Sequence, residues 1–197
     1  MIATLAKLAR RLNSRSRLPP LILVTDAARL PDPLAVAARL PAGCAVLLRH
    51  YEDAGRLALG RRLARLCRAR RLPLLVAGDV GLAAALRADG VHLPEGLARS
   101  GAAGARLWAR RRGGLLTAAA HSRAALRRAA IQGADAALLS PVFPTASHPG
   151  APTLGPRRFA RLARGARLPV YALGGVTAAR LAALRHSGAA GIATVGG

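Results

Sequence analysis

Short apolar runs alternate with helical Ala, Leu and Arg patterns along the whole chain. Runs buried on both faces and separated by helices are typical of parallel strands with crossover helices. Eight such runs predict strands at Leu21–Thr25, Ala45–Arg49, Leu74–Ala77, Gly90–Leu93, Leu115–Ala118, Ala136–Leu139, Val170–Ala172 and Gly191–Thr194. Helices are predicted at Pro33–Arg39, Ala54–Arg70, Gly81–Arg87, Ala98–Arg112, Arg123–Gln132, Pro156–Arg164 and Ala178–His186.

Eight strands are the number that closes a barrel, so we expect one α/β domain over residues 1–197, a short (β/α)8 TIM barrel. The chain stops after the eighth strand, so the final helix is lacking. We expect that the amphipathic N-terminal helix within residues 1–17, at Ile2 to Leu12, or a partner subunit covers the gap. A doubly wound open sheet is the alternative, but no Gly-rich dinucleotide motif follows the first strand.

Composition narrows the class of protein. The chain has 197 residues and is 52% hydrophobic, enough for one core, and arginines interrupt every candidate membrane span. The N-terminus lacks the apolar segment and cleavage site of a secretory signal. Cys44 and Cys67 have no metal-like spacing. These features predict a cytoplasmic protein with two buried, reduced thiols.

The formal net charge of +23 is the chain's most unusual bulk property. It is the kind of excess that a nucleic-acid partner would select. The arginines, however, are spread over all helices, and no aromatic stacking set accompanies them. The single Lys and the abundance of Ala, Gly and Pro fit a GC-rich genome. We therefore attribute the positive charge to the base composition of the genome rather than to nucleic-acid or membrane binding.

In barrels of this kind the chemistry lies in loops that follow strands. Gly174 and Gly175 follow the seventh strand, and Gly196 and Gly197 follow the eighth. Glycines there allow backbone N–H groups to approach an anion, and a helix begins near Thr177. The pattern predicts a phosphate-binding cup, although paired glycines also make tight turns.

The loop after the sixth strand, residues 140–150, is rich in hydroxyls and prolines. Thr145 and Ser147 are candidate donors to phosphate oxygens, since hydroxyls donate one hydrogen bond each. His148 is a candidate substrate contact or a solvated side chain.

Two histidines and one arginine lie near strand ends. His121 follows the fifth strand, where an imidazole can exchange protons, or can simply hold the loop. His92 lies within the fourth strand and is a substrate-binding candidate or a wall residue. The guanidinium of Arg49 suits phosphate or carboxylate, and Asp26 is expected to cap the turn after the first strand.

Four runs in register resemble the thiamine phosphate synthase and TenI family: residues 88–93 (ADGVHL), 133–135 (GAD), 141–145 (PVFPT) and 172–176 (ALGGV). The resemblance implies a (β/α) barrel, usually an oligomer, that acts in thiamine synthesis. In this family the synthase joins a pyrimidine pyrophosphate to a thiazole phosphate with Mg²⁺, whereas the TenI-like tautomerase isomerises a thiazole phosphate without the metal.

Carried over residue by residue, the resemblance divides the site in two. Its thiazole phosphate half is present, with Thr145 and Ser147 at the family's T-x-T hydroxyls and Gly174, Gly175 and Gly196 in its phosphate cup. Its pyrophosphate and metal half is eroded: only Arg49 remains of Q-x-R-x-K, His148 replaces a lysine, and Leu97 falls on a metal carboxylate. Asp79 and Glu95 lie close enough in sequence to repair that metal site.

The leading interpretation is a TenI-like thiazole tautomerase in which His121 moves a proton without metal. The first alternative is a thiamine phosphate synthase that uses Mg²⁺ at a rearranged metal site with Asp79, Glu95 and Arg49. The second is a non-catalytic barrel that binds thiazole or thiamine phosphates. The expected partners are a small thiazole phosphate and further copies of this chain.

Overall fold

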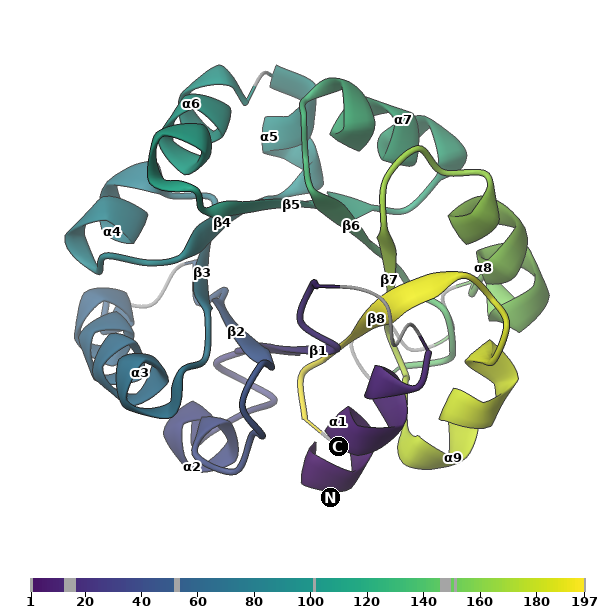
Figure 1. The fold of residues 1–197 in the computed structure, drawn as a ribbon, viewed down its shortest axis with the longest axis horizontal. Coiled ribbons are helices and arrows are strands. Elements are labelled where there is room, and N and C mark those ends of the chain that lie inside the picture. Colours follow the sequence, from purple (N-terminus) through teal and green to yellow (C-terminus); the bar gives the residue numbers. More distant parts are fainter. Residues whose placement is uncertain are drawn as a thin grey trace.

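The structure is a computed structural model that describes residues 2–12, 17–51, 54–100, 102–145, 150 and 152–196. Its eight strands are all parallel and follow one another around a closed barrel, in which β8 pairs with β1 (Figure 1). They are β1 Leu21–Val24, β2 Ala45–Leu48, β3 Leu74–Ala77, β4 Gly90–Leu93, β5 Leu115–Ala120, β6 Ala136–Leu139, β7 Val170–Leu173 and β8 Ala189–Thr194. The closed order confirms the barrel and rules out an open sheet.

Successive strand residues face opposite sides of the barrel wall. Leu21 and Leu23 of β1 belong to the core shared with the helices, whereas Ile22 and Val24 belong to a second cluster that fills the barrel. Tyr171 of β7 is the largest side chain of this inner cluster, and its hydroxyl donates to the Pro19 carbonyl at 2.6 Å. The strands are therefore apolar on both faces, and no alternation marks them in the sequence.

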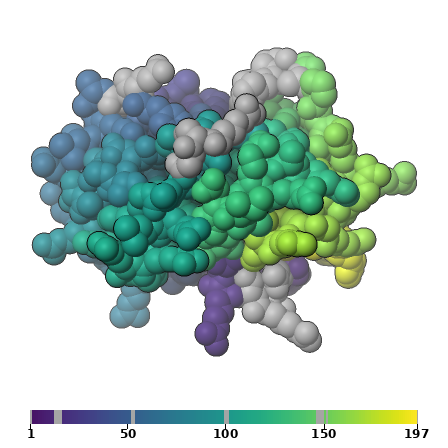
Figure 2. Space-filling model, turned by 90° about the horizontal axis from the view of Figure 1, so that it is seen from above, coloured from purple at the N-terminus to yellow at the C-terminus, as the bar shows by residue number. Residues whose placement is uncertain are grey.

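The helices form the outer layer, which covers the barrel wall in the space-filling side view (Figure 2). They are α1 Ile2–Arg10, α2 Pro33–Ala37, α3 Arg56–Arg70, α4 Val80–Ala85, α5 Glu95–Ser100, α6 Ala103–Arg112, α7 Arg123–Ile131, α8 Gly155–Arg164 and α9 Ala178–Leu181, with a 3₁₀ turn η1 at Ala182–Leu184. No described helix is both long enough and apolar enough to cross a bilayer.

Two helix predictions were wrong in extent. The helix predicted at Ala98–Arg112 is two helices, α5 and α6, because Ala102 before α6 has φ −114° and ψ 19°, outside the helical region. The last predicted helix is shorter than expected and ends in η1. Ser122 caps α7 and Thr177 caps α9, since their hydroxyls accept hydrogen bonds from the amides three residues on.

The N-terminal helix α1 lies against the outer face of the barrel beside β1 and β8 (Figure 1). Ile2, Leu5, Ala6 and Ala9 of α1 are buried, and α1 packs against α9, β1 and β8. Among the described residues, α1 therefore covers the barrel wall where β8 pairs with β1.

Both cysteines are buried and unbonded, as predicted. Burial raises the pKa of Cys44 to about 11 and that of Cys67 to about 12. Their thiols therefore stay protonated at neutral pH and act as small apolar core groups.

Candidate functional site at the carboxyl ends of the strands

His121 lies at the end of β5 with its side chain 52% exposed. Its Nδ1–H donates to the Ser140 carbonyl at 2.9 Å, in the residue that follows β6. Its Nε2 lies 3.7 Å from Glu95 Oε2, and Arg128 donates to Glu95 Oε1 at 2.9 Å. The ring is thus fixed through Nδ1 and leaves Nε2 to exchange a proton beside a carboxylate.

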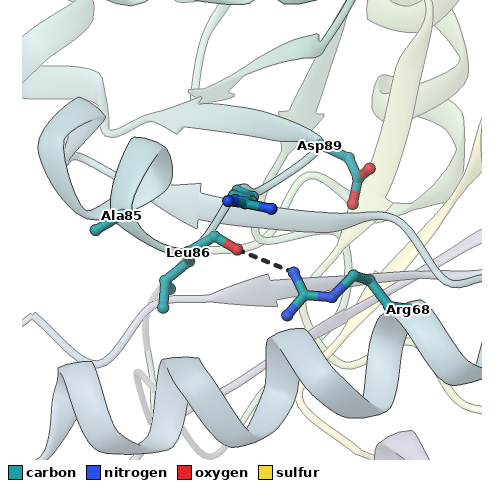
Figure 3. A pocket seen from close by; sticks show the side chains of 5 residues that line it. Arg68, Ala85, Leu86 and Asp89 are labelled. Atoms are coloured by element: carbon teal, nitrogen blue, oxygen red, sulfur yellow. Dashed lines mark hydrogen bonds between the residues drawn. The ribbon is translucent and has the colours of Figure 1, made fainter.

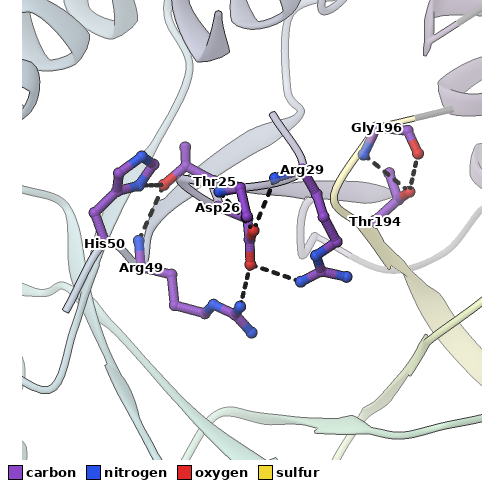
Figure 4. Close-up of polar contacts among 8 residues, drawn as sticks. Thr25, Asp26, Arg29, Arg49, His50, Thr194 and Gly196 are labelled. Carbon is purple, nitrogen blue, oxygen red and sulfur yellow. Dashed lines mark hydrogen bonds and ion pairs between the residues drawn. The ribbon is translucent and has the colours of Figure 1, made fainter. Parts of the chain in front are cut away.

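Asp26, after β1, accepts hydrogen bonds from Ala28 N and Arg29 N, which confirms its predicted turn-capping role. The same carboxylate pairs with the guanidiniums of Arg29, at 2.7 Å, and Arg49 (Figure 4). The hydrogen bond from Arg29 is the largest cause that lowers the pKa of Asp26 to about 2. Arg49 therefore has a carboxylate partner within the chain, and its contact with a substrate stays a prediction.

His92 points into the barrel, between the outward-facing Val91 and Leu93, and is 5% exposed. Its Nδ1 shares a hydrogen bond of 2.9 Å with Thr117 Oγ1. Loss of hydration lowers its pKa to about 4, with a smaller contribution from Arg49. His92 is therefore a buried, neutral residue of the barrel wall at pH 7, and its contact with a substrate stays a prediction.

Gly174 and Gly175 follow β7 at φ +93° and +61° and press against the loop after β6. A Cβ on Gly174 would lie 2.9 Å from Pro141 Cα, and one on Gly175 would lie 2.3 Å from the Pro144 carbonyl oxygen. The amide of Phe143 also donates to the Gly174 carbonyl. Close approach between the two loops accounts for both glycines, and their contact with phosphate stays a prediction.

Arg180 adds a positive charge to this pair of loops, and sequence reasoning missed it. Its Nη1 donates to the carbonyls of Pro144, at 3.1 Å, and Gly175, at 3.0 Å. Its guanidinium also lies 5.6 Å from the centre of the Phe143 ring. The spacing of three residues from the cap Thr177 was the available signal, because it places Arg180 in the first turn of α9.

The remaining phosphate candidates are only partly described. Gly196 follows β8 at φ +137°, and its amide donates to Thr194 Oγ1 at 3.3 Å (Figure 4). Thr145 lies one residue beyond Pro144 in the same loop. Ser147, His148 and Gly197 lie outside the described residues. The described candidates thus follow the adjacent strands β6, β7 and β8 at one end of the barrel.

The carboxylates expected to hold Mg²⁺ do not fit that ion. Asp79 caps α4 by accepting the Leu82 amide at 2.8 Å, and its second oxygen lies 3.9 Å from Arg56. Glu95 is occupied by Arg128 and His121. Among the described residues, no three His, Cys, Asp or Glu side chains gather as metal ligands. A divalent cation takes mainly oxygen ligands, and two carboxylates paired with arginines do not supply a set.

A hollow of about 380 Å³ lies away from these loops, beside residue 89 at the amino end of β4. It is lined by Arg68, Ala85, Leu86, Arg87 and Asp89 (Figure 3). Arg68 donates to the Leu86 carbonyl at 3.3 Å, and Asp89 accepts the Leu74 amide. These contacts satisfy backbone groups at the end of α4 and at the start of β3, so Arg68 and Asp89 have a structural role.

The fold and these loops define an α/β barrel whose imidazole, guanidinium and glycine-rich groups gather at the carboxyl ends of its strands, where such barrels hold phosphate-bearing small molecules. Within that class the chain belongs to the thiamine monophosphate synthase family, whose model matches residues 21–197.

Relatives in other organisms support this membership. The thiamine-phosphate synthase of Levilactobacillus brevis is 38% identical over 146 residues, which cover 71% of this chain and 64% of that protein. That of Methylobacillus flagellatus is 39% identical over 132 residues, or 66% of this chain and 61% of that protein. The chain thus spans less than two thirds of the length of these curated relatives.

Solved structures show the same fold. Thiamine phosphate pyrophosphorylase from Pyrococcus furiosus superposes with a TM-score of 0.71 at 24% identity, and the alignment covers 92% of this chain and 87% of that one. FabK from Thermotoga maritima superposes with a TM-score of 0.67 at 19% identity, covering 93% of this chain and 60% of that one. These likenesses describe the barrel and not its chemistry.

Proposed function

We propose that the chain is an enzyme of thiamine phosphate metabolism that binds a thiazole phosphate at the carboxyl ends of the strands and isomerises it by proton transfer through His121. The geometry of His121 carries the proposal: Nδ1 is anchored to Ser140, and Nε2 lies beside Glu95. The imidazole takes a proton from one ring atom and returns it to another. The ring double bonds shift as the proton is relocated, so the isomerisation needs no oxidant, reductant or second substrate.

The phosphate would be held by the loops after β6, β7 and β8. Arg180 supplies a fixed positive charge there, and the helix α9 begins beside it. The hydroxyl of Thr145 and the amides of Gly174, Gly175 and Gly196 are the donors within this region. The paired states of Asp79 and Glu95 support a reaction that uses no Mg²⁺.

The second candidate is the coupling reaction of a thiamine phosphate synthase, which the names of the relatives favour. That reaction expels pyrophosphate and needs its negative charge neutralised in the transition state. Asp79 and Glu95 are paired with arginines and do not form a ligand set for a divalent cation, so among the described residues after β1 to β3 the neutralising charge would come from Arg29, Arg49 and Arg56.

Both candidates are tested by following thiazole phosphate isomerisation in D₂O by NMR, with EDTA present. His121→Asn should lower the isomerisation rate by about 10²-fold or more, the usual effect of removing an acid–base group, with little change in KM. His186→Asn is the matched control, because His186 is exposed and already has a positive φ that Asn tolerates.

Each other outcome assigns a different function. Thiamine phosphate formed from the two separate substrates, with or without Mg²⁺, would establish the synthase reaction instead. Binding of thiazole phosphate with no turnover of any kind would leave the non-catalytic barrel. An unchanged rate in His121→Asn would refute the role given to that imidazole.

A further inference from the structure

We propose that a groove between α3 and α4, on the side of the barrel where the strands begin, binds an extended acidic segment of a partner protein. Asp89, which lines the groove, directly precedes β4, whereas His121 follows β5. Because all eight strands are parallel, these two residues lie at opposite ends of the barrel. The inference therefore goes beyond the proposed function and does not depend on it.

Two adjoining hollows form this α3–α4 groove. The hollow of about 380 Å³ beside residue 89 is continued along α3 by a second hollow of about 230 Å³. Arg68 and Leu86 line both of them, so the two hollows are parts of one depression (Figure 3). Leu86 is buried, and a Cβ on Gly60 of α3 would lie only 2.6 Å from Leu86 Cδ1. The floor of the groove is therefore set by close packing between α3 and the end of α4.

Arginines line the groove from both helices. Arg61, Arg65 and Arg68 come from α3, and Arg87 comes from the α4 side, one residue past the cap of that helix. A single acid, Asp89, lines the same groove, and its carboxylate already accepts a hydrogen bond from a backbone amide. The lining thus carries a clear excess of positive charge, which favours an anionic ligand.

Most of this charge is available to a ligand. Within the described part of the chain, the side chains of Arg61, Arg65 and Arg87 make no hydrogen bond or ion pair. The base composition of a genome can account for the number of arginines, but it does not bring them together around one hollow. A carboxylate in this groove would receive charge-assisted hydrogen bonds from guanidinium groups that have no competing acid.

The backbone at Arg87 gives independent support. Arg87 has φ +51° and is one of three described non-glycine residues in the left-handed region. It occupies the position just past a helix end, where glycine and asparagine are the usual residues. An arginine is strained there, and strain of this kind is typical of positions whose side chain has a use.

The spacing of the arginines sets the shape of the ligand. Along an α-helix, Arg65 lies about 6 Å and Arg68 about 10 Å beyond Arg61, and the three share one face. A compact anion reaches one or two of these guanidinium groups, whereas a chain with repeated charges reaches all of them. Alternate residues of an extended peptide lie about 7 Å apart on one side, so their carboxylates can approach successive arginines.

The remaining lining residues favour a peptide over a nucleic acid. Single-stranded nucleic acids bind where bases stack on aromatic side chains. Among the described residues that line the two hollows, none is aromatic, and Ala64, Ala85 and Leu86 supply the apolar surface. Small apolar groups of this kind can pack against the methylene groups and methyl side chains of a peptide.

The test is the binding of a fluorescently labelled peptide of alternating Glu and Ala to the whole chain, followed by fluorescence anisotropy at about 0.15 M salt. We expect the acidic peptide to bind, more weakly as salt is added, and the corresponding Gln and Ala peptide not to bind. Arg65→Glu should weaken binding about tenfold or more, because it removes a charge-assisted hydrogen bond and adds a like charge. Arg62→Glu is the matched control and should bind within about twofold of the wild type, since Arg62 is exposed on the same helix but lines neither hollow.

Arg87→Asn separates the charge from the fold. Asparagine tolerates the positive φ, so the midpoint of thermal unfolding should not fall, while peptide binding should still weaken several-fold. Failure of the acidic peptide to bind, or equal weakening in Arg62→Glu and Arg65→Glu, would overturn the proposal. So would tighter, Arg65-dependent binding of a single-stranded RNA of the same charge, because the groove would then serve a nucleic acid. None of these results bears on thiazole phosphate isomerisation, which should be unchanged in all three variants.

Discussion

Replacing Gly175 by alanine should destabilise the protein through the contact between the loops after β6 and β7. At φ +61° a non-glycine residue costs about 1 kcal/mol or slightly more. The added Cβ would lie 2.3 Å from the Pro144 carbonyl oxygen and 2.9 Å from Phe143 Cβ, so the backbone must move. Overpacking of this kind costs about 1–3 kcal/mol. We therefore expect Gly175→Ala to lower the free energy of unfolding by roughly 2–4 kcal/mol.

Gly113 provides a matched control. It also has φ +61°, at the end of α6, but a Cβ there would meet nothing within 4 Å. Gly113→Ala should therefore cost only the conformational part, about 1 kcal/mol. The difference between the two variants, about 1–3 kcal/mol in urea denaturation at pH 7, isolates the clash.

The same substitution should weaken phosphate binding. Displacing the loop at Phe143 and Pro144 moves Thr145 and the two carbonyls that hold Arg180. Titration with inorganic phosphate should show weaker binding in Gly175→Ala and unchanged binding in Gly113→Ala. Equal losses of stability in the two variants would show that the close approach of the loops contributes nothing.

Two further predictions concern buried polar groups inside the barrel. The pKa of His92 is about 4, below its value of about 6.5 in the unfolded chain, so the unfolded state takes up the proton first as pH falls. The free energy of unfolding of the wild type should therefore fall by about 3 kcal/mol between pH 6.5 and 4, and the fall in His92→Asn should be smaller by that amount. Urea denaturation at several pH values measures both, and an equal fall in the two proteins would contradict this reasoning. Tyr171→Phe should lower the free energy of unfolding by about 1–3 kcal/mol at pH 7, because it leaves the Pro19 carbonyl without its donor. A midpoint of thermal unfolding within about 1 °C of the wild type would refute that reason.

The barrel was predictable because its signals are local and repeated. Each strand is a short apolar run such as Leu21–Val24 or Ala136–Leu139, and a helix follows each of the first seven strands. The count of eight then left a closed barrel as the simplest arrangement. The placement of α1 was one of two possibilities, because the amphipathic N-terminal helix or a partner subunit could cover the outer face beside the eighth strand.

The polar partners of the site were not predictable, because they depend on contacts between distant loops. Asp26 and Arg49 are separated by 23 residues, and Glu95 and Arg128 by 33. With 31 Lys and Arg residues in the chain, nothing in the sequence distinguishes these arginines from the ones that lie on the surface. Likewise, the Gly174-Gly175 pair indicates an anion site or a close approach equally well, and only the structure shows the Pro141–Pro144 segment against it.

The pairing of the carboxylates decides which ligands the site attracts. Three acidic residues at the strand ends each contact at least one arginine: Asp26 contacts Arg29 and Arg49, Asp79 contacts Arg56, and Glu95 contacts Arg128. A divalent cation would have to displace a guanidinium from each carboxylate and then face the repulsion of the displaced charge. An anionic ester gains instead, because the arginines outnumber these acids and Arg180 adds a further positive charge. Among the residues that the structure describes at this end of the barrel, the excess of arginine over these acids therefore favours an anionic ligand.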